Sequence, residues 1–158
     1  MHGSNDAADR DCKTRERQLS KTFFATPQDV EAAFYEALER ADLEAMMQVW
    51  ADEEEIVCIH PGGPRLSGYA MVREAWQGVF SGGPRLRVQV TTLSFVANPF
   101  TAIHSLIEYV GIKEDSSQQA PVVATNVYVR GPTGWRLVVH HASPVPPDSI
   151  AESPKILH

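Results

Sequence analysis

The sequence lacks the features that would place the chain in a membrane or in an oxidising compartment. No stretch of its 158 residues reaches the roughly 18 consecutive apolar residues that a membrane-spanning helix needs. The N-terminal residues are polar and of mixed charge, which is not the pattern of a secretory signal. Only two cysteines occur, Cys12 in a polar segment and Cys58 in an apolar one. We therefore expect free thiols and a cytoplasmic location.

Positive charge is also scarce. Lys and Arg number 14 against 20 Asp and Glu, a formal net charge of −6 at pH 7. Because an acidic surface repels phosphate backbones and anionic headgroups, neither nucleic acid nor a membrane surface is expected as a partner. Residues 1–22 mix both charges with few large apolar groups, which predicts a solvated arm. One domain is predicted over residues 23–143, followed by an extended, proline-bearing tail over residues 144–158.

Helical patterns are present in the first half of the chain. Thr26 is placed to cap a helix whose apolar residues recur at helical spacing, and Asp42 is placed to cap a shorter second one. Residues 56–60 predict a strand that is apolar on both faces. Ser67 or Gly68 then opens a third helix, which two glycines and a proline close.

The second half of the chain predicts strands. Apolar residues alternate from Leu86 and then change phase at Leu93 and Phe95, which predicts a β-bulge near residues 91–92. Three further strands are predicted at residues 101–112, 122–130 and 135–142. Helices followed by a run of strands indicate an α+β fold.

The last predicted hairpin indicates which side chains share a face of the sheet. A tight loop centred on Pro132 and Thr133 pairs Arg130 with Trp135. Extending this register places one group on the first face: Asn126, Tyr128, Leu137, Val139 and His141. The second face then carries Thr125, Val127, Val129, Val138 and His140. Both faces are apolar, so we expect one to cover the helices and the other to form a homodimer through the sheet.

Three runs in the middle of the chain resemble a known family. They read Cys-Ile-His-Pro at 58–61, Arg-Leu-Ser-Gly at 65–68 and Val-Arg-Glu-Ala-Trp at 72–76. A similar stretch of ketosteroid isomerases has an Asp before the proline, then a Ser-Gly turn and a helix with an aromatic residue. Residues 134–143 are similar to the last strand of SnoaL-like domains and of the calcium/calmodulin kinase association domain. Residues 26–143 thus resemble the NTF2-like superfamily, in its SnoaL-like and ketosteroid isomerase-like branches.

This resemblance implies a fold and a pocket. The fold is an α+β cone, in which a curved, antiparallel to mixed sheet wraps around three N-terminal helices and leaves a pocket at one end. By position, His60 stands where the isomerases have their catalytic Asp and becomes the candidate catalytic base. The resemblance also places Trp76, Asn126 and His141 in the pocket. Trp50 and Tyr128 join them as candidate substrate-binding residues, because aromatic side chains line apolar cavities.

Each of these residues has a structural alternative. His60 and His141 can equally end a strand and bond to a loop, and the aromatic residues can be ordinary core. Asn126, in a valine-rich strand, either forms hydrogen bonds with a neighbouring polar group or contacts a ligand. His140 is expected on the opposite face in a structural or interface role. The position of His104 is left open.

The oxyanion hole of the isomerases is not recovered from the sequence. It consists of a tyrosine and a protonated acid. Tyr35 lies off the apolar stripe of its helix and is expected to face water, and Glu108 is the one candidate acid, with its facing undetermined. Steroid isomerase activity is therefore not expected.

Two functions follow from the sequence. Metal and cofactor motifs are missing, so no cofactor is expected. The first function is a small-molecule-binding domain that transfers a proton through His60 on an apolar, oxygenated substrate. The second is a non-catalytic dimerisation or assembly domain.

Overall fold

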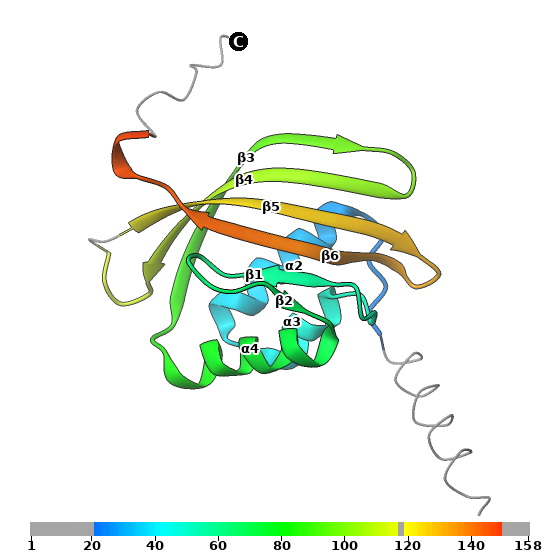
Figure 1. The fold of residues 1–158 in the computed structure, drawn as a ribbon, viewed down its shortest axis with the longest axis horizontal. Coiled ribbons are helices and arrows are strands. Elements are labelled where there is room, and N and C mark those ends of the chain that lie inside the picture. The colour runs from blue at the N-terminus through cyan, green and yellow to red at the C-terminus, as the bar shows by residue number, and fades with distance from the viewer. Residues whose placement is uncertain (1–20, 117–118, 150–158) are drawn as a thin grey trace, which may run out of the picture.

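The chain folds as helices packed in the hollow of one curved sheet (Figure 1). A computed structural model describes residues 21–116 and 119–149. The helices in these ranges are α2 (Pro27–Arg40), α3 (Leu43–Val49) and α4 (Tyr69–Gly82), with a 3-10 turn, η1, at Pro147–Ser149. The strands are β1 (Val57–Ile59), β2 (Leu66–Ser67), β3 (Leu86–Ala97), β4 (Thr101–Ile112), β5 (Gln119–Gly131) and β6 (Gly134–Pro144).

The helices begin where the sequence predicts. The Thr26 hydroxyl accepts a hydrogen bond from the Asp29 N–H, and the Asp29 carboxylate accepts one from the Thr26 N–H, forming a capping box. Helix α2 ends at Ala41, whose φ of 52° turns the chain sharply. Asp42 then caps α3 by accepting from the Ala45 N–H. Gly68, with φ 89°, precedes α4.

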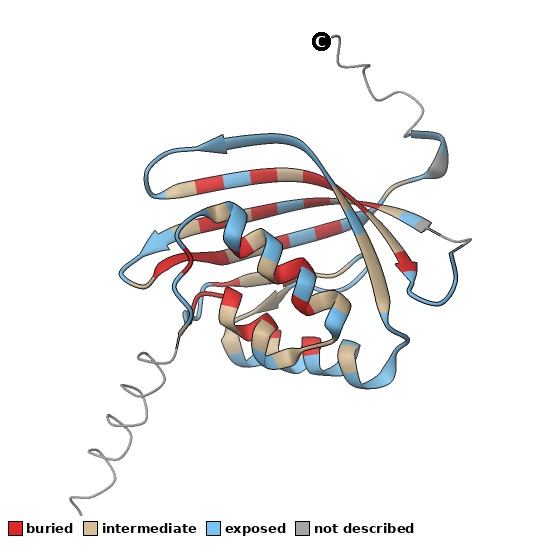
Figure 2. Cartoon of the chain, turned by 180° about the vertical axis from the view of Figure 1, so that it is seen from behind, coloured by how far each residue is buried: buried red, intermediate tan, exposed pale blue. Residues whose placement is uncertain are grey.

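The sheet is mixed and follows the order β2-β1-β6-β5-β4-β3. Only the β1–β6 pair within it is parallel. Buried residues concentrate where the helices face the sheet, whereas the second half of β3 and the β3–β4 turn, residues 91–100, are exposed (Figure 2). The architecture is therefore the predicted α+β cone.

Two β-bulges interrupt the long strands. On β3, the register shifts between Thr92 and Ser94, so Leu93 is the extra residue, next to the predicted position. On β6, Val127 pairs with Val139 while Tyr128 pairs with Leu137, which leaves Val138 as an extra residue that the sequence pattern does not reveal.

The bulge on β6 corrects the predicted register. The hairpin loop and the Arg130–Trp135 and Tyr128–Leu137 pairs are as predicted. Beyond Val138 the prediction is wrong, because Asn126 pairs with His140 rather than with Val139. One inserted residue reverses the facing of every later side chain. His140 is consequently buried, and His141 is exposed on the outer side.

The predictions for the two ends of the chain concern mostly residues outside the described ranges. These are the arm at residues 1–22 and the tail at residues 144–158, together with Cys12. Among the helices that are described, none is long and apolar enough to cross a membrane.

Candidate functional site

A row of side chains crosses the concave side of the sheet. The strand register aligns Phe95 on β3, His104 on β4, Asn126 on β5, His140 on β6 and Cys58 on β1. All except Phe95 are at most 3% exposed. Buried polar groups need hydrogen-bond partners, and helix α2 supplies them for His104 and Asn126.

Helix α2 faces the sheet with a polar stripe beside its apolar one. Glu31, Tyr35 and Glu39 are spaced four residues apart and therefore lie on one side of the helix. Glu31 and Tyr35 bond to side chains of the sheet, and Glu39 accepts from the Val88 N–H at 2.9 Å. The prediction that Tyr35 faces water is wrong, because the curved sheet covers this second side of the helix and leaves Tyr35 only 8% exposed.

The first polar cluster joins Tyr35, Glu108, Asn126 and His140. The Tyr35 hydroxyl donates to Oε1 of Glu108 at 2.5 Å, and the Asn126 amide donates to the Tyr35 oxygen at 3.2 Å. Oδ1 of Asn126 lies 2.6 Å from Nδ1 of His140. Since an amide oxygen can only accept, Nδ1 of His140 carries the proton in this contact.

Burial controls the ionisation of this cluster. It raises the pKa of Glu108 to about 7, and the nearby Glu31 carboxylate adds to the rise while the bond from Tyr35 opposes it. Burial also raises the pKa of Tyr35, with Glu108 contributing. The pKa of His140 falls to about 3, mainly through burial. At neutral pH, Glu108 is therefore close to half protonated, and His140 is neutral.

The second polar cluster joins Glu31, His104 and Tyr128. Oε2 of Glu31 lies 2.5 Å from Nδ1 of His104 and accepts from the Tyr128 hydroxyl at 2.9 Å. Burial raises the pKa of Tyr128, and the Glu31 charge adds to the rise. His104, whose position the sequence left open, is thus an interior residue.

His60 lies just after β1, beside Cys58 and Trp76. Its Nε2 is 3.8 Å from Sγ of Cys58, and its ring centroid is 4.6 Å from that of Trp76, edge to face. Half-burial lowers the pKa of His60, so the imidazole is a neutral acceptor at pH 7. Burial raises the pKa of Cys58 to about 12, which keeps its thiol protonated.

The structure brings most of the predicted site residues to one interior and excludes one of them. Trp50, Trp76, Asn126 and Tyr128 are all at most 2% exposed. The indole N–H groups of Trp50 and Trp76 are buried without a hydrogen-bond partner among the described residues. His141 is exposed on the outer face, so its placement in the interior is wrong, and His140 takes that place.

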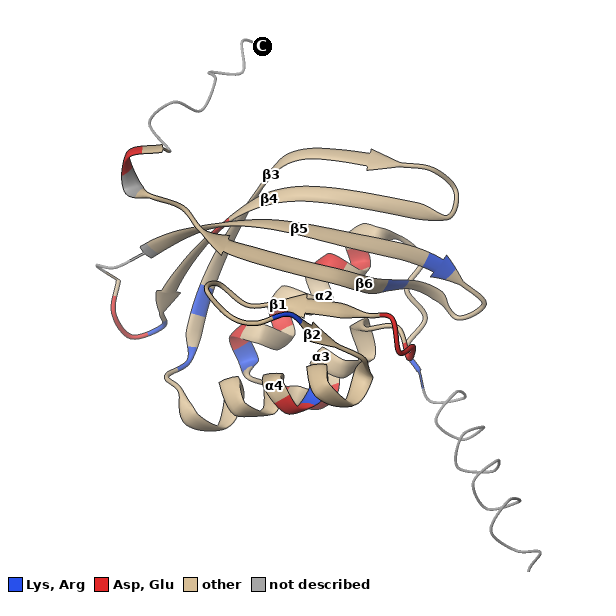
Figure 3. Ribbon diagram, in the orientation of Figure 1, with Lys and Arg blue, Asp and Glu red and all other residues tan. Residues whose placement is uncertain are grey.

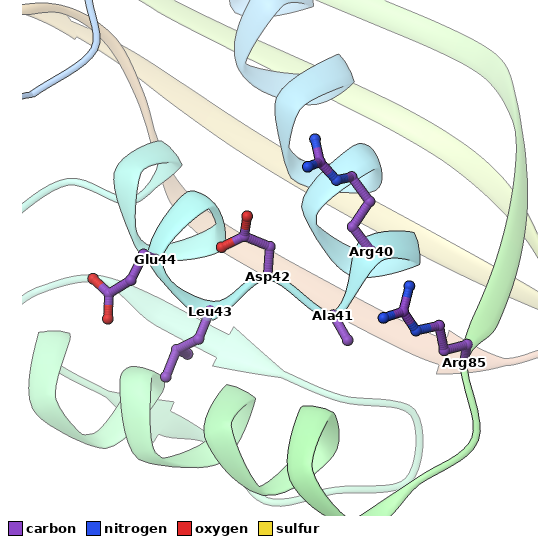
Figure 4. A pocket seen from close by; sticks show the side chains of 6 residues that line it. All are labelled: Arg40, Ala41, Asp42, Leu43, Glu44 and Arg85. Atoms are coloured by element: carbon purple, nitrogen blue, oxygen red, sulfur yellow. The ribbon is translucent and has the colours of Figure 1, made fainter.

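Three hollows on the described part of the chain lie away from these clusters. The first, of about 430 Å³, lies where α2 meets α3, and Arg40, Arg85, Asp42 and Glu44 line it (Figure 4). Two others, of about 250 and 330 Å³, lie near residues 83–86 and beside the β5–β6 loop. The described residues hold no group of three or more His, Cys, Asp or Glu that could bind a metal ion.

Comparison with known proteins gives consistent matches. Residues 28–148 match the SnoaL-like domain family. A candidate calcium/calmodulin-dependent protein kinase type II association domain from Thiobacillus denitrificans is 37% identical, with a TM-score of 0.76, over 80% of this chain and 100% of that one. A candidate dehydratase of the NTF2-like family from Streptomyces avermitilis is 33% identical, with a TM-score of 0.67, over 74% of this chain and 91% of that one.

A curated relative is also similar, over part of its length. The F-box protein SKIP8 of Arabidopsis thaliana is 28% identical over 127 residues, which are 78% of this chain. The chain spans about half of that relative's length (52%).

Proposed function

We propose that this chain, which belongs to the SnoaL-like domain family, binds a small, oxygenated, apolar molecule on the concave side of its sheet and transfers a proton on it. The buried Tyr35–Glu108 pair carries the proposal. A carboxyl group with a pKa of about 7 lies 2.5 Å from a phenol, and both side chains are at most 8% exposed. Such a pair can supply two hydrogen-bond donors to one substrate oxygen.

The chemistry assigned to this pair is stabilisation of negative charge on oxygen. A ligand carbonyl oxygen that takes the place of the Tyr35–Glu108 bond would accept from the phenol and from protonated Glu108. When a proton leaves the carbon beside the carbonyl, the electron pair of the C–H bond moves onto that oxygen. The two donors stabilise the negative charge of this enolate more than they stabilise the neutral ketone, which lowers the activation barrier to removal of the proton.

His60 is assigned the role of proton acceptor. It is neutral at pH 7 because burial lowers its pKa. Trp76 holds its ring edge to face, at 4.6 Å between centroids. The base takes the proton from carbon and returns it to the same or another carbon, so the step is balanced without a cofactor. The unpartnered indole N–H groups of Trp50 and Trp76, buried within the described ranges, are further donors for the ligand.

The relatives agree with this class of chemistry in general terms. The Streptomyces avermitilis relative is named as a candidate dehydratase, and elimination of water commonly begins with removal of a proton beside a carbonyl. The name belongs to that protein, and we carry over to this chain only the proton-transfer class of reaction.

The test uses hydrogen–deuterium exchange on a simple ketone. 2-Tetralone in D2O exchanges the protons beside its carbonyl, and NMR measures the rate without knowledge of the natural substrate. We expect the protein to accelerate exchange and His60→Ala to abolish the acceleration with little change in melting temperature. His141→Ala, on the outer face, is the matched control and should retain it. Equal acceleration by the His60 variant would overturn the proposal.

Assembly is a second candidate function, which the β3–β4 hairpin favours. The cross-strand partners Val96 and Ile103 are 70% and 42% exposed, and Phe100 at the turn is 69% exposed. Residues 88–107 carry no Asp, Glu, Lys or Arg, so the free end of this hairpin is uniformly tan in Figure 3. Large exposed apolar groups without charged neighbours mark protein contacts. The Thiobacillus denitrificans relative is itself named as a candidate association domain.

We propose a homodimer through this side of the sheet as the assembled form. Light scattering at micromolar concentration measures its mass. Ile103→Lys should shift the protein to the monomer, whereas Gln77→Lys, at an exposed position of α4, is the control for added charge. A monomeric wild-type protein would rule out assembly as the function.

A further inference from the structure

The Glu31–His104 pair has the geometry of an oriented acceptor site. Nδ1 of His104 faces Oε2 of Glu31 at 2.5 Å. When the imidazole is neutral and Nδ1 carries its proton, the other ring nitrogen is a bare acceptor. A carboxylate that holds one nitrogen of a histidine fixes the orientation of the ring and its tautomer.

The second nitrogen of His104 has no partner. Nε2 is buried and makes no hydrogen bond within the described ranges, although His104 as a whole is only 3% exposed. Leaving a buried polar atom unpaired costs free energy, so such an atom calls for an explanation. The ring lies 4.9 Å from that of Tyr128 and 6.1 Å from that of Phe95, between centroids.

The surroundings of His104 are suited to an apolar ring. Its cross-strand partner Phe95 is 64% exposed, near the open end of the sheet. Tyr128 closes the other side, but its hydroxyl is already committed to Glu31. Nε2 of His104 is therefore the atom here that a ligand could pair with, and aromatic side chains lie on either side of the His104 ring.

We propose that His104, held by Glu31, is a second binding site, which accepts a hydrogen bond from the hydroxyl group of an aromatic alcohol. Phe95 forms the apolar wall for the ring of that ligand. The site adjoins the first polar cluster, since His104 pairs with Asn126 across the strands, but it uses neither Tyr35 nor Glu108 and stands whether or not that pair performs proton transfer.

The first test observes His104 directly. Nitrogen-15 NMR of the imidazole distinguishes the two neutral tautomers and the doubly protonated form. The expected result is a ring with a proton on Nδ1 and none on Nε2. In Glu31→Leu, which offers no acceptor to Nδ1, this preference should be lost. A proton on Nε2 in the wild-type protein, in either form, would remove the acceptor and overturn the site.

The second test compares two probes that differ in one donor. Fluorine NMR follows the binding of 4-fluorophenol, which has a hydroxyl, and of 4-fluoroanisole, which has none. We expect His104→Phe to lower the affinity for 4-fluorophenol about tenfold, which corresponds to one lost hydrogen bond, and to leave 4-fluoroanisole unchanged. Phe95→Ser should weaken both probes, because it removes the wall and not the acceptor.

His141→Phe is the matched control, since it makes the same replacement on the outer face. Circular dichroism establishes that each variant is folded. Equal affinity of the wild-type protein for the two probes would overturn the proposal. So would phenol binding that Glu108→Gln abolishes and His104→Phe leaves intact, because the probe would then occupy the other cluster.

Discussion

Tyr35 on α2 and Glu108 on β4 lie 73 residues apart in the chain and share a hydrogen bond of 2.5 Å in the protein interior. The bond ties the helix to the middle of the sheet. Asn126 extends the connection to His140, so four polar groups from four elements satisfy one another. Because each group depends on its neighbour, replacing any one of them by an apolar side chain leaves an unpaired buried atom.

Glu108→Gln should change how stability depends on pH. The pKa of Glu108 is about 7 in the folded protein against an ordinary value of 4.5, so the folded protein holds the proton more tightly than the unfolded chain. Its contribution is fully present below pH 4.5 and is lost as the pH rises through 7, by about 3 kcal/mol. Gln cannot ionise, so the variant should gain stability relative to the wild-type protein over this range.

Urea denaturation at several pH values between 4.5 and 7.5 measures this difference. Glu114→Gln, which removes an exposed carboxyl from the β4–β5 loop, is the matched control. A constant difference between Glu108→Gln and the wild-type protein would contradict preferential protonation of Glu108 in the folded state.

His140→Phe should change the pH dependence of stability in the opposite direction to Glu108→Gln. The pKa of His140 falls from 6.5 to about 3 on folding, so below pH 6.5 the unfolded chain takes up a proton that the folded one does not. The stabilisation present above pH 6.5 is lost as the pH falls towards 3, by about 2 kcal/mol between pH 6.5 and 5. Because Phe does not take up a proton, the variant should not lose this stabilisation as the pH falls.

The same denaturation series tests His140, with His141→Phe as the adjacent control on the outer face. Parallel pH profiles for His140→Phe and the wild-type protein would show that folding leaves the pKa of this imidazole unchanged, contrary to its burial.

Asn126→Leu should destabilise the protein by about 2–4 kcal/mol, because the Tyr35 hydroxyl loses a donor and His140 Nδ1 loses its acceptor. Thr125→Val, at the neighbouring exposed position, should change the free energy of unfolding by less than about 0.5 kcal/mol. Chemical denaturation at pH 7 compares the two. A loss below about 1 kcal/mol for Asn126→Leu would mean that water replaces the amide.

Much of the fold could be predicted from the sequence, because local signals encode it. Thr26 and Asp42 cap the helices as predicted, and the phase change before Leu93 reveals the bulge on β3. On β6, the apolar run of Leu137, Val138 and Val139 hides the same kind of phase change. A bulge inside such a run leaves no mark on the pattern, so the sequence predicts the reverse of the observed facing for His140 and His141.

The candidate site was harder to predict, because its partners are distant in sequence. The resemblance places His60 and Asn126 in the pocket. Apolar residues occupy both the odd-numbered and the even-numbered positions of β4, so the sequence does not determine which face of the sheet carries Glu108. The spacing of Glu31, Tyr35 and Glu39 was a usable signal. A polar stripe beside an apolar one is expected on a helix that a curved sheet covers on a second side, whereas Tyr35 considered alone predicts a side chain that faces water.

A deletion and an insertion in β6 test whether the register of this strand positions the row of buried polar side chains across the sheet, here called the polar row (His104, Asn126 and His140). Deletion of Val138 removes the extra residue, and a regular ladder then keeps the Tyr128–Leu137 and Asn126–His140 pairs. Insertion of one alanine after Val139 leaves the bulge in place but sets the alanine opposite Asn126, so His140 moves opposite Thr125 and turns outward. The two variants therefore change the chain by one residue each and have opposite consequences for His140.

We expect the deletion to fold with a loss of about 1–3 kcal/mol, because the strand loses a bend and a half-buried side chain while the polar row is kept. The insertion should lower the free energy of unfolding by more than about 3 kcal/mol or prevent folding. It breaks the Asn126–His140 bond and turns His141 from the outer face of the sheet to the inner face. Denaturation gives the energies, and a nitrogen-15 spectrum of the histidines reports which rings are buried. An insertion variant as stable as the deletion variant would show that the pairing of His140 with Asn126 contributes little to the fold.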